Sequence, residues 1–214
     1  MDHKIIIAMV GLPARGKSFT SNNLSRYLNW CGIKTKIFNS GDYRRNMMKG
    51  FQSADFFDKS NLENHNKKEQ ISQKCFNDLL EWISEEESNC VAIFDSTNSN
   101  KMRRSYLLNT AKKFNLHLNI FFLELITNNY SIISNNIVLK QKSADYITKN
   151  SDEALNDFKL RLKYYENSYE EINDDENLNY IKIINFTEKI HIKNVFGINQ
   201  SLILSYLLNL RINK

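Results

Sequence analysis

Proline, glycine, cysteine and histidine are all scarce: the 214 residues include one proline, six glycines, three cysteines and four histidines. The low proline and glycine contents exclude collagen-like and proline-rich linker sequences. Cys31, Cys75 and Cys90 lie far apart, form no Cys-x-x-Cys motif and have no histidines at the spacing of a zinc site. We therefore expect reduced thiols in a cytoplasmic protein, and neither a disulfide framework nor a structural zinc site.

Long hydrophobic runs are also missing. No apolar stretch approaches the ~18 residues that a membrane span needs, and residues 1–10 are too short and too lightly flanked for a signal peptide. The net charge of +5 is compatible with nucleic acid, an anionic membrane surface or small phosphorylated ligands. Because the basic residues are spread out and form no block, we expect neither a nucleic-acid nor a membrane partner.

Apolar, β-branched runs alternate with longer helical patterns, and the length suits one domain around one core. Strands are predicted at residues 4–10, 34–39, 90–95, 117–126 and 179–186. Helices are predicted at residues 17–30, roughly 67–86, 101–114, 130–141, 152–170 and 197–210. Polar surface loops are predicted at residues 53–66 and 170–177. This order predicts a three-layer α/β fold of the P-loop NTPase type, with helices on both faces of a mostly parallel sheet.

A phosphate-binding loop is the strongest motif, and it reads Gly11-Leu12-Pro13-Ala14-Arg15-Gly16-Lys17-Ser18. It fits G-x-x-x-x-G-K-S/T, follows an apolar strand and opens an amphipathic helix. The two glycines let the main chain close around a phosphate, and the N–H groups at the helix start form an anion cradle. Lys17 adds charge at the outer phosphates, and Ser18 offers a hydroxyl to Mg²⁺. The motif predicts binding of ATP with Mg²⁺.

A second element is the apolar run that ends at Asp95. Ligands of open parallel sheets bind beyond the carboxyl ends of the strands, so Asp95 and the phosphate loop are expected to face one crevice. There Asp95 can hold the Mg²⁺ shell through water or accept the proton of an attacking hydroxyl, and the sequence leaves both roles open. An aspartate that only caps the next helix is the plainer alternative.

Further motifs accompany these two elements. They are Arg26–Trp30, Phe38–Arg45, Phe94–Asn98, Arg103-Arg104, Asp145-Tyr146, Asp157-Phe158, Tyr165–Tyr169 and Tyr180–Ile183. With the phosphate loop, they resemble the kinase domain of the 6-phosphofructo-2-kinase/fructose-2,6-bisphosphatase family. The Tyr-Arg-Arg and Tyr-Glu-x-Ser-Tyr elements are particular to that family. The resemblance implies transfer of the γ-phosphoryl group of ATP to the 2-hydroxyl of fructose 6-phosphate, giving fructose 2,6-bisphosphate, a regulator of glycolysis.

The resemblance also implies roles for individual residues. Catalysis is assigned to Lys17, Asp95 and Lys140, and metal binding to Ser18 and Asp95. ATP contacts are assigned to Gly11, Leu12, Pro13, Ala14, Arg15, Gly16, Lys17, Ser18, Phe19 and Asn136. Sugar-phosphate contacts are assigned to Arg44, Lys68, Thr97, Arg103, Lys140, Arg161 and Tyr165. Arginine suits the second anion because its planar fork meets phosphate bidentately.

The sequence departs from the family pattern at a few positions. Lys67 or Lys68 stands where many members carry arginine, which keeps the charge but loses the fork and is expected to weaken sugar-phosphate binding. Thr127 and Val138 stand where some members carry a cysteine and a basic residue.

The phosphatase half of the family works through an Arg-His-Gly motif. The histidines of this chain are His3, His65, His117 and His191, and none precedes a glycine. Residues 1–214 are therefore expected to form a single kinase domain without a phosphatase domain. A homodimer, or a fused phosphatase domain in a longer parent chain, stays open.

Two alternative functions also stay open. A P-loop kinase can act on another acceptor, such as the 5′-hydroxyl of a polynucleotide, because fold alone does not fix the substrate. A non-catalytic nucleotide-sensing or RNA-binding module is the other alternative. The absence of an aromatic stacking motif and of a clustered basic stripe disfavours that module.

Overall fold

The computed structural model describes residues 4–48, 51–86, 89–114, 118–141, 145–147, 149–186 and 188–210. Its sheet has six strands in the order β2-β3-β1-β4-β5-β6. Their bounds are β1 Lys4–Val10, β2 Lys34–Asn39, β3 Cys90–Asp95, β4 Asn119–Ile126, β5 Tyr180–Ile184 and β6 Lys189–Lys193. Strands β1 to β5 pair in parallel, and β6 pairs antiparallel to β5.

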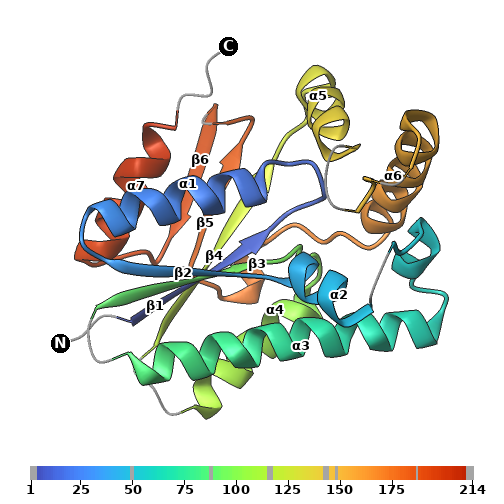
Figure 1. Ribbon diagram of the computed structural model, residues 1–214. Helices are drawn as coiled ribbons and strands as arrows, with labels where there is room; N and C mark the ends of the chain where they lie inside the picture. The colour runs from blue at the N-terminus through green and yellow to red at the C-terminus, as the bar shows by residue number, and fades with distance from the viewer. Residues whose placement is uncertain are drawn as a thin grey trace.

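Helices cover both faces of the sheet. Their bounds are α1 Lys17–Trp30, α2 Ser40–Met48, α3 Leu62–Glu85, α4 Lys101–Lys113, α5 Tyr130–Gln141, α6 Ser151–Glu166 and α7 Ile198–Leu208, with short 3₁₀ helices η1 Ala54–Phe57 and η2 Asp174–Glu176. Figure 1 shows α1 and α7 on one face and α3 and α4 on the other. The predicted three-layer α/β fold with a mostly parallel sheet is confirmed. Within the described ranges, no helix is both long and apolar enough to cross a bilayer.

The central strand β1 explains how two cores form. Successive side chains of a strand point to opposite faces. Ile5, Ile7 and Met9 pack with α1 and α7, whereas Ile6 and Ala8 pack with α3 and α4 on the other face. A strand buried on both faces must be apolar at nearly every position, which is why this segment reads as a continuous hydrophobic run.

Two of the predicted strands, 117–126 and 179–186, have bounds that differ from those in the structure. Strand β4 begins at Asn119, and the predicted start at His117 lies outside the described residues. Strand β5 ends at Ile184, since Asn185 and Phe186 adopt φ angles of 49° and 54° and form a turn. The sequence reading also missed β6, a short edge strand whose residues are mostly exposed and therefore lack an apolar pattern.

The predicted helix boundaries need corrections as well. The predicted loop 53–66 is wrong, because it contains η1 and the first turn of α3. Helix α3 begins at Leu62, where the Asn61 side chain accepts a hydrogen bond from the N–H of Asn64. Helix α6 ends at Glu166 instead of residue 170, and the predicted loop 170–177 contains η2. Helices α1 and α5 have the predicted bounds, and the remaining predicted helix ends differ from the structure by at most two residues.

The sequence reading missed α2 entirely. This helix follows β2 directly, and it is short and polar, with Arg44 as its buried residue. The Asn39 side-chain oxygen accepts hydrogen bonds from the N–H groups of Gly41 at 2.8 Å and Asp42 at 3.1 Å, which fixes the first turn. The consequence for function is that α2 carries Arg44 to the carboxyl edge of the sheet.

Candidate functional site

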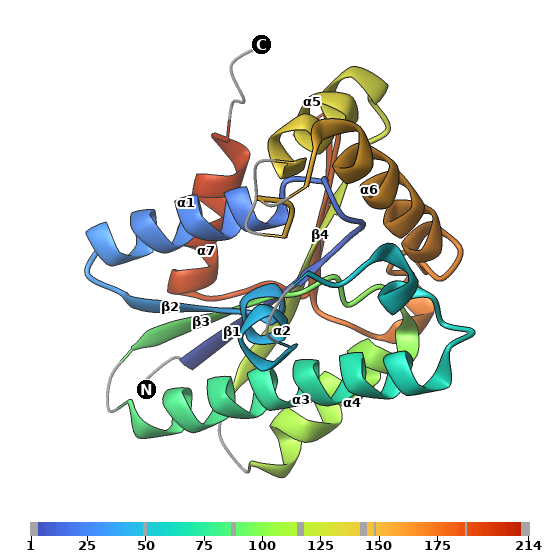
Figure 2. The ribbon, with the colours of Figure 1, turned by 45° about the vertical axis from the view of Figure 1, so that its right-hand side comes forward.

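A cavity of about 710 Å³ lies at the carboxyl ends of β1, β2 and β3. Its walls come from the phosphate loop, from the ends of β2 and β3, and from α2, α3, α5 and α6. In Figure 2, α2 lies in front of the sheet, below α5 and α6. This edge is where parallel α/β sheets bind ligands, because loops from several strands converge there.

The phosphate loop is shaped by close backbone contacts. The N–H of Gly11 donates to the carbonyl of Thr97 at 3.1 Å, and a Cβ at Gly11 would lie 2.6 Å from the carbonyl oxygen of Leu125. Gly16 has φ 85° and is the N-cap of α1. These positions need glycine because of steric room and backbone angle. The loop therefore leads into a helix whose N-terminal N–H groups favour an anion at the cavity.

Lys17 is the buried cation of the loop. Its side chain donates to the carbonyl of Leu12 at 2.7 Å, and the residue is 8% exposed. Burial lowers the pKa of Lys17 to about 7, although the negative charge of Asp95 acts in the opposite direction. Lys140 and Arg15 lower this pKa further through charge repulsion. Without a bound anion, the lysine is therefore only partly protonated near neutral pH.

ATP binding is expected to take up a proton through Lys17. At about pH 8 the ligand-free lysine is mostly neutral, and the phosphates of ATP raise its pKa, so we expect uptake of ~1 proton per ATP. Calorimetric titration in two buffers of different ionisation enthalpy measures this uptake. Lys17→Arg is the control, because a guanidinium stays protonated and the uptake should vanish. No uptake by the unmodified protein would contradict the assignment of Lys17 as the phosphate-binding cation.

Asp95 ends β3 inside the cavity and is 5% exposed. Its Oδ2 accepts a hydrogen bond of 2.5 Å from Nδ2 of Asn39, the last residue of β2. Ser18 lines the same cavity from the first turn of α1. A carboxylate and a hydroxyl are oxygen donors of the kind that Mg²⁺ uses together with substrate phosphates. The donor set therefore fits the implied metal.

The other part of the cavity is a basic cluster around one carboxylate. Asp145 accepts two hydrogen bonds from Arg44 at 2.6 and 2.7 Å, one from Arg45 at 3.1 Å and one from Arg161 at 3.1 Å. Burial acts to raise the pKa of Asp145, but Arg44 and Arg161 outweigh it and hold the pKa well below its ordinary value. One carboxylate is shared by three arginines, so cationic groups remain for an anionic ligand.

Aromatic rings support the same cations. The guanidinium carbon of Arg161 lies 3.8 Å from the ring centroid of Phe57, and that of Arg44 lies 5.2 Å from it. The ammonium nitrogen of Lys68 lies 5.3 Å from the ring centroid of Tyr165. Burial acts to raise the pKa of the Tyr165 phenol, but Lys68, Arg161 and Arg44 lower that pKa overall. This part of the cavity therefore has a strongly positive potential.

Arg103 enters the cavity from α4. Its side chain pairs with Glu69 and hydrogen-bonds the hydroxyl of Ser72, both on α3. Thr97 lines the cavity after β3, and the Tyr165 hydroxyl lies within hydrogen-bonding reach of it.

The structure brings most of the predicted site residues together. Those that line the cavity are Pro13, Ala14, Gly16, Lys17, Ser18, Phe19, Arg44, Lys68, Asp95, Thr97, Arg103, Asn136, Lys140, Arg161 and Tyr165. Gly11, Leu12 and Arg15 do not line it. The Arg15 side chain instead folds back to the carbonyl of Pro13 at 3.3 Å. Asn136 supports the loop by donating to the carbonyl of Ala14 at 2.9 Å.

Sequence reasoning missed two residues that organise the site. Asn39 holds Asp95 and starts α2, and Asp145 joins the arginines. Asn39 offered a usable signal, since a polar residue that ends a strand before a helix is a candidate cap. Asp145 appeared in the sequence only within the Asp145-Tyr146 motif of the family resemblance, and its role could not be assigned because its partners lie 16 to 101 residues away in the chain.

Comparisons with known proteins identify the family of the chain. A family model for 6-phosphofructo-2-kinase matches residues 1–214. The 6-phosphofructo-2-kinase/fructose-2,6-bisphosphatase 4 of Rattus norvegicus is 40% identical over 210 residues, which cover 97% of this chain and 44% of that protein. The 6-phosphofructo-2-kinase 1 of Saccharomyces cerevisiae is 39% identical over 210 residues, covering 96% of this chain and 25% of that protein. The chain spans less than half the length of these curated relatives.

Among solved structures, the crystal structure of APE1195 matches with a TM-score of 0.50 and 16% identity. The match covers 98% of this chain and 95% of that chain, and it supports the fold alone. The family model and the two relatives carry the assignment of family. By these matches, the chain belongs to the 6-phosphofructo-2-kinase family.

Proposed function

We propose that this chain transfers the γ-phosphoryl group of ATP to the 2-hydroxyl of fructose 6-phosphate. The observation that carries the proposal is a single cavity with two cationic parts, one at the phosphate loop and one around Arg44 and Arg161. The first part suits the phosphates of a nucleoside triphosphate, and the second part suits the phosphate of a phosphorylated acceptor. A volume of about 710 Å³ is large enough for two small ligands side by side.

In the proposed reaction, the oxygen of the 2-hydroxyl attacks the γ-phosphorus while the bond between that phosphorus and the bridging oxygen of the departing ADP breaks. The proton of the 2-hydroxyl passes to the Asp95 carboxylate or to solvent. Lys17 and Lys140 place positive charge beside the transferred group, where it stabilises the equatorial oxygens. Arg44, Arg103 and Arg161 bind the 6-phosphate and orient the sugar, which makes the reaction effectively intramolecular. Mg²⁺, held by Ser18 and Asp95 with the ATP phosphates, would neutralise charge that develops on those phosphates.

The test is turnover with defined acceptors. The protein is incubated with ATP and Mg²⁺, and with either fructose 6-phosphate or a 5′-hydroxyl oligonucleotide. We expect an acid-labile sugar bisphosphate from the first mixture and no labelled oligonucleotide from the second. Absence of sugar product at saturating substrates would refute the proposal. Transfer to the oligonucleotide would support the polynucleotide alternative, and binding of ATP without any transfer would support the non-catalytic one.

Arg161→Ala is expected to raise KM for fructose 6-phosphate by at least about 30-fold, because it removes a buried charged partner of the sugar phosphate. The KM for ATP should change little, since the phosphate loop is untouched. Steady-state kinetics with each substrate varied separately measures both constants. Lys163→Ala is the matched control, because Lys163 is an exposed cation on the same helix. An equal rise in both KM values would contradict the assigned role of Arg161.

The remaining expectations belong to the same proposal. We propose a cytoplasmic location, because ATP and fructose 6-phosphate are both metabolites of that compartment. Residues 1–214 would act as one kinase unit, which works as a homodimer or together with a fused phosphatase domain. Sedimentation of the protein distinguishes a dimer from a monomer.

A further inference from the structure

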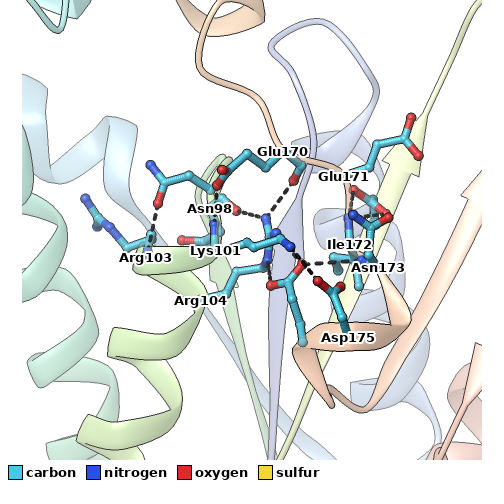
Figure 3. Close-up of polar contacts among 12 residues, drawn as sticks. Asn98, Lys101, Arg103, Arg104, Glu170, Glu171, Ile172, Asn173 and Asp175 are labelled. Carbon is cyan, nitrogen blue, oxygen red and sulfur yellow. Dashed lines mark hydrogen bonds and ion pairs between the residues drawn. The ribbon is translucent and has the colours of Figure 1, made fainter.

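Arg104, beside the cavity residue Arg103, has a side chain that is fully buried at 0% exposure. Its Nε and one terminal nitrogen donate to the two carboxylate oxygens of Glu176 at 2.7 and 2.6 Å. The other terminal nitrogen donates to the carbonyls of Asn98 at 3.1 Å and Glu170 at 2.9 Å. Figure 3 shows Arg104 between the Asn98 loop and the segment that contains Glu170. One guanidinium thus joins two distant stretches of chain.

The first stretch is the loop after β3. Thr97 of this loop lines the cavity, and its neighbour Asn98 donates to the carbonyl of Met9 at 2.8 Å, just before the phosphate loop. Asn98 has φ 41°, an uncommon conformation that needs surrounding contacts to persist. The position of Thr97 in the cavity therefore depends on what holds Asn98.

The second stretch, residues 167–179, connects α6 to β5. The N–H of Glu170 donates to the carbonyl of Ser99 at 2.7 Å, and the Glu170 side chain accepts from the N–H of Lys101 at 2.7 Å. The same stretch contains Tyr169, whose hydroxyl donates at 2.6 Å to Glu124, a buried residue of β4. Because α6 carries Arg161 and Tyr165 into the cavity, this segment sets where those two side chains lie.

We propose that Arg104 is a positioning residue for the sugar-phosphate part of the cavity. It fixes the separation between Thr97 on one side and Tyr165 and Arg161 on the other, without touching either substrate. A lysine cannot replace it, because a single ammonium lacks the planar fork that meets a carboxylate and two carbonyls together. This inference rests on the proposed function and deepens it.

Three variants test the role. Arg104→Lys and Arg104→Met each remove the fork, and we expect KM for fructose 6-phosphate to rise about 10-fold or more. The KM for ATP should stay within about 2-fold, because Arg104 does not contact the phosphate loop directly and reaches it only through the loop after β3. Lys101→Ala is the matched control. It breaks an exposed ion pair with Asp175, of 2.8 Å, which joins the same two stretches, and it should leave both constants unchanged.

A double variant separates positioning from mere stability. Arg104→Met leaves the carboxylate of Glu176 buried and unpaired, which is expected to lower Tm, whereas Arg104→Met/Glu176→Met removes both charges and is expected to restore much of it. The contacts to the carbonyls of Asn98 and Glu170 are still lost in the double variant. We therefore expect its sugar KM to stay high although Tm recovers. The proposal would be overturned if Tm recovered and the KM for fructose 6-phosphate equalled that of the unmodified protein. It would also be overturned if the KM values for ATP and for fructose 6-phosphate rose in parallel.

The outcome is distinguishable from a failure of the proposed function. If the unmodified protein does not phosphorylate fructose 6-phosphate, the proposed function fails. The connection that Arg104 makes between the two stretches is then measured without substrate, by hydrogen exchange of the Glu170 and Ile172 amides. We expect faster exchange of both amides in the double variant than in Lys101→Ala. Equal exchange in the two variants would overturn the role of Arg104 whatever the substrate is.

Discussion

Lys17→Met is expected to lower kcat by about 10²–10³, the effect of removing a preorganised charge at a transferred group. Methionine keeps the length and apolar stem of the side chain, so the fold around the loop should persist. The loss arises because the ammonium is buried at 8% exposure, next to Asp95 and the loop, where water screens its charge little. Initial rates with ATP and fructose 6-phosphate at saturation measure the effect.

Thermal stability provides the control for this variant. Removing a buried cation whose pKa is lowered to about 7 should leave Tm unchanged or slightly higher, because burying the charged form costs free energy. A kcat within about 3-fold of the unmodified protein would contradict the proposed role of Lys17 at the transferred phosphate.

Asp95→Asn is expected to lower kcat by about 10²–10⁴, the range for removing a positioned proton acceptor. Asparagine has nearly the same shape, and its oxygen can still accept the hydrogen bond from Asn39 that Asp95 accepts at 2.5 Å. The change therefore removes charge and basicity more than structure. Titration of the rate with Mg²⁺ separates the two open roles. A higher Mg²⁺ requirement indicates a metal-holding role, whereas a lower kcat at an unchanged requirement indicates proton acceptance.

Asp175→Asn is the matched control for this experiment. Asp175 is an exposed carboxylate paired with Lys101 and does not line the cavity. We expect this variant to keep its rate and its Mg²⁺ dependence. If Asp95→Asn also kept its rate and its Mg²⁺ dependence, Asp95 would have neither of the two proposed roles and would serve only the structure at the end of β3.

The parts of the fold that the sequence predicted are those with local causes. Strand β1 is buried on both faces, so its apolar run was visible without any knowledge of its neighbours. The phosphate loop was visible for a related reason. Gly11 and Gly16 adopt φ angles of 136° and 85°, a local backbone conformation that favours glycine. The sequence also predicted that Asp95 and this loop face one cavity, because parallel strands end at the same edge of the sheet. Both line the cavity in the structure.

The parts that escaped prediction have long-range causes. Helix α2 buries Arg44 against Asp145, about a hundred residues away, and residues 40–48 themselves show no helical hydrophobic pattern. Strand β6 forms because β5 offers an open edge, which no local pattern of its own residues indicates. The role of Arg104 is of the same kind. Its sequence neighbour Arg103 enters the cavity, and only the fold shows that the two side chains have different partners.

The most direct test of the account is a crystal structure with a non-hydrolysable ATP analogue and fructose 6-phosphate bound together. We predict that the γ-phosphate lies beside Lys17 and Asp95, that the sugar 6-phosphate lies among Arg44, Arg103 and Arg161, and that the 2-hydroxyl faces the γ-phosphorus. A sugar phosphate bound outside this cavity, or bound within it with the 2-hydroxyl turned away from the nucleotide, would contradict the account.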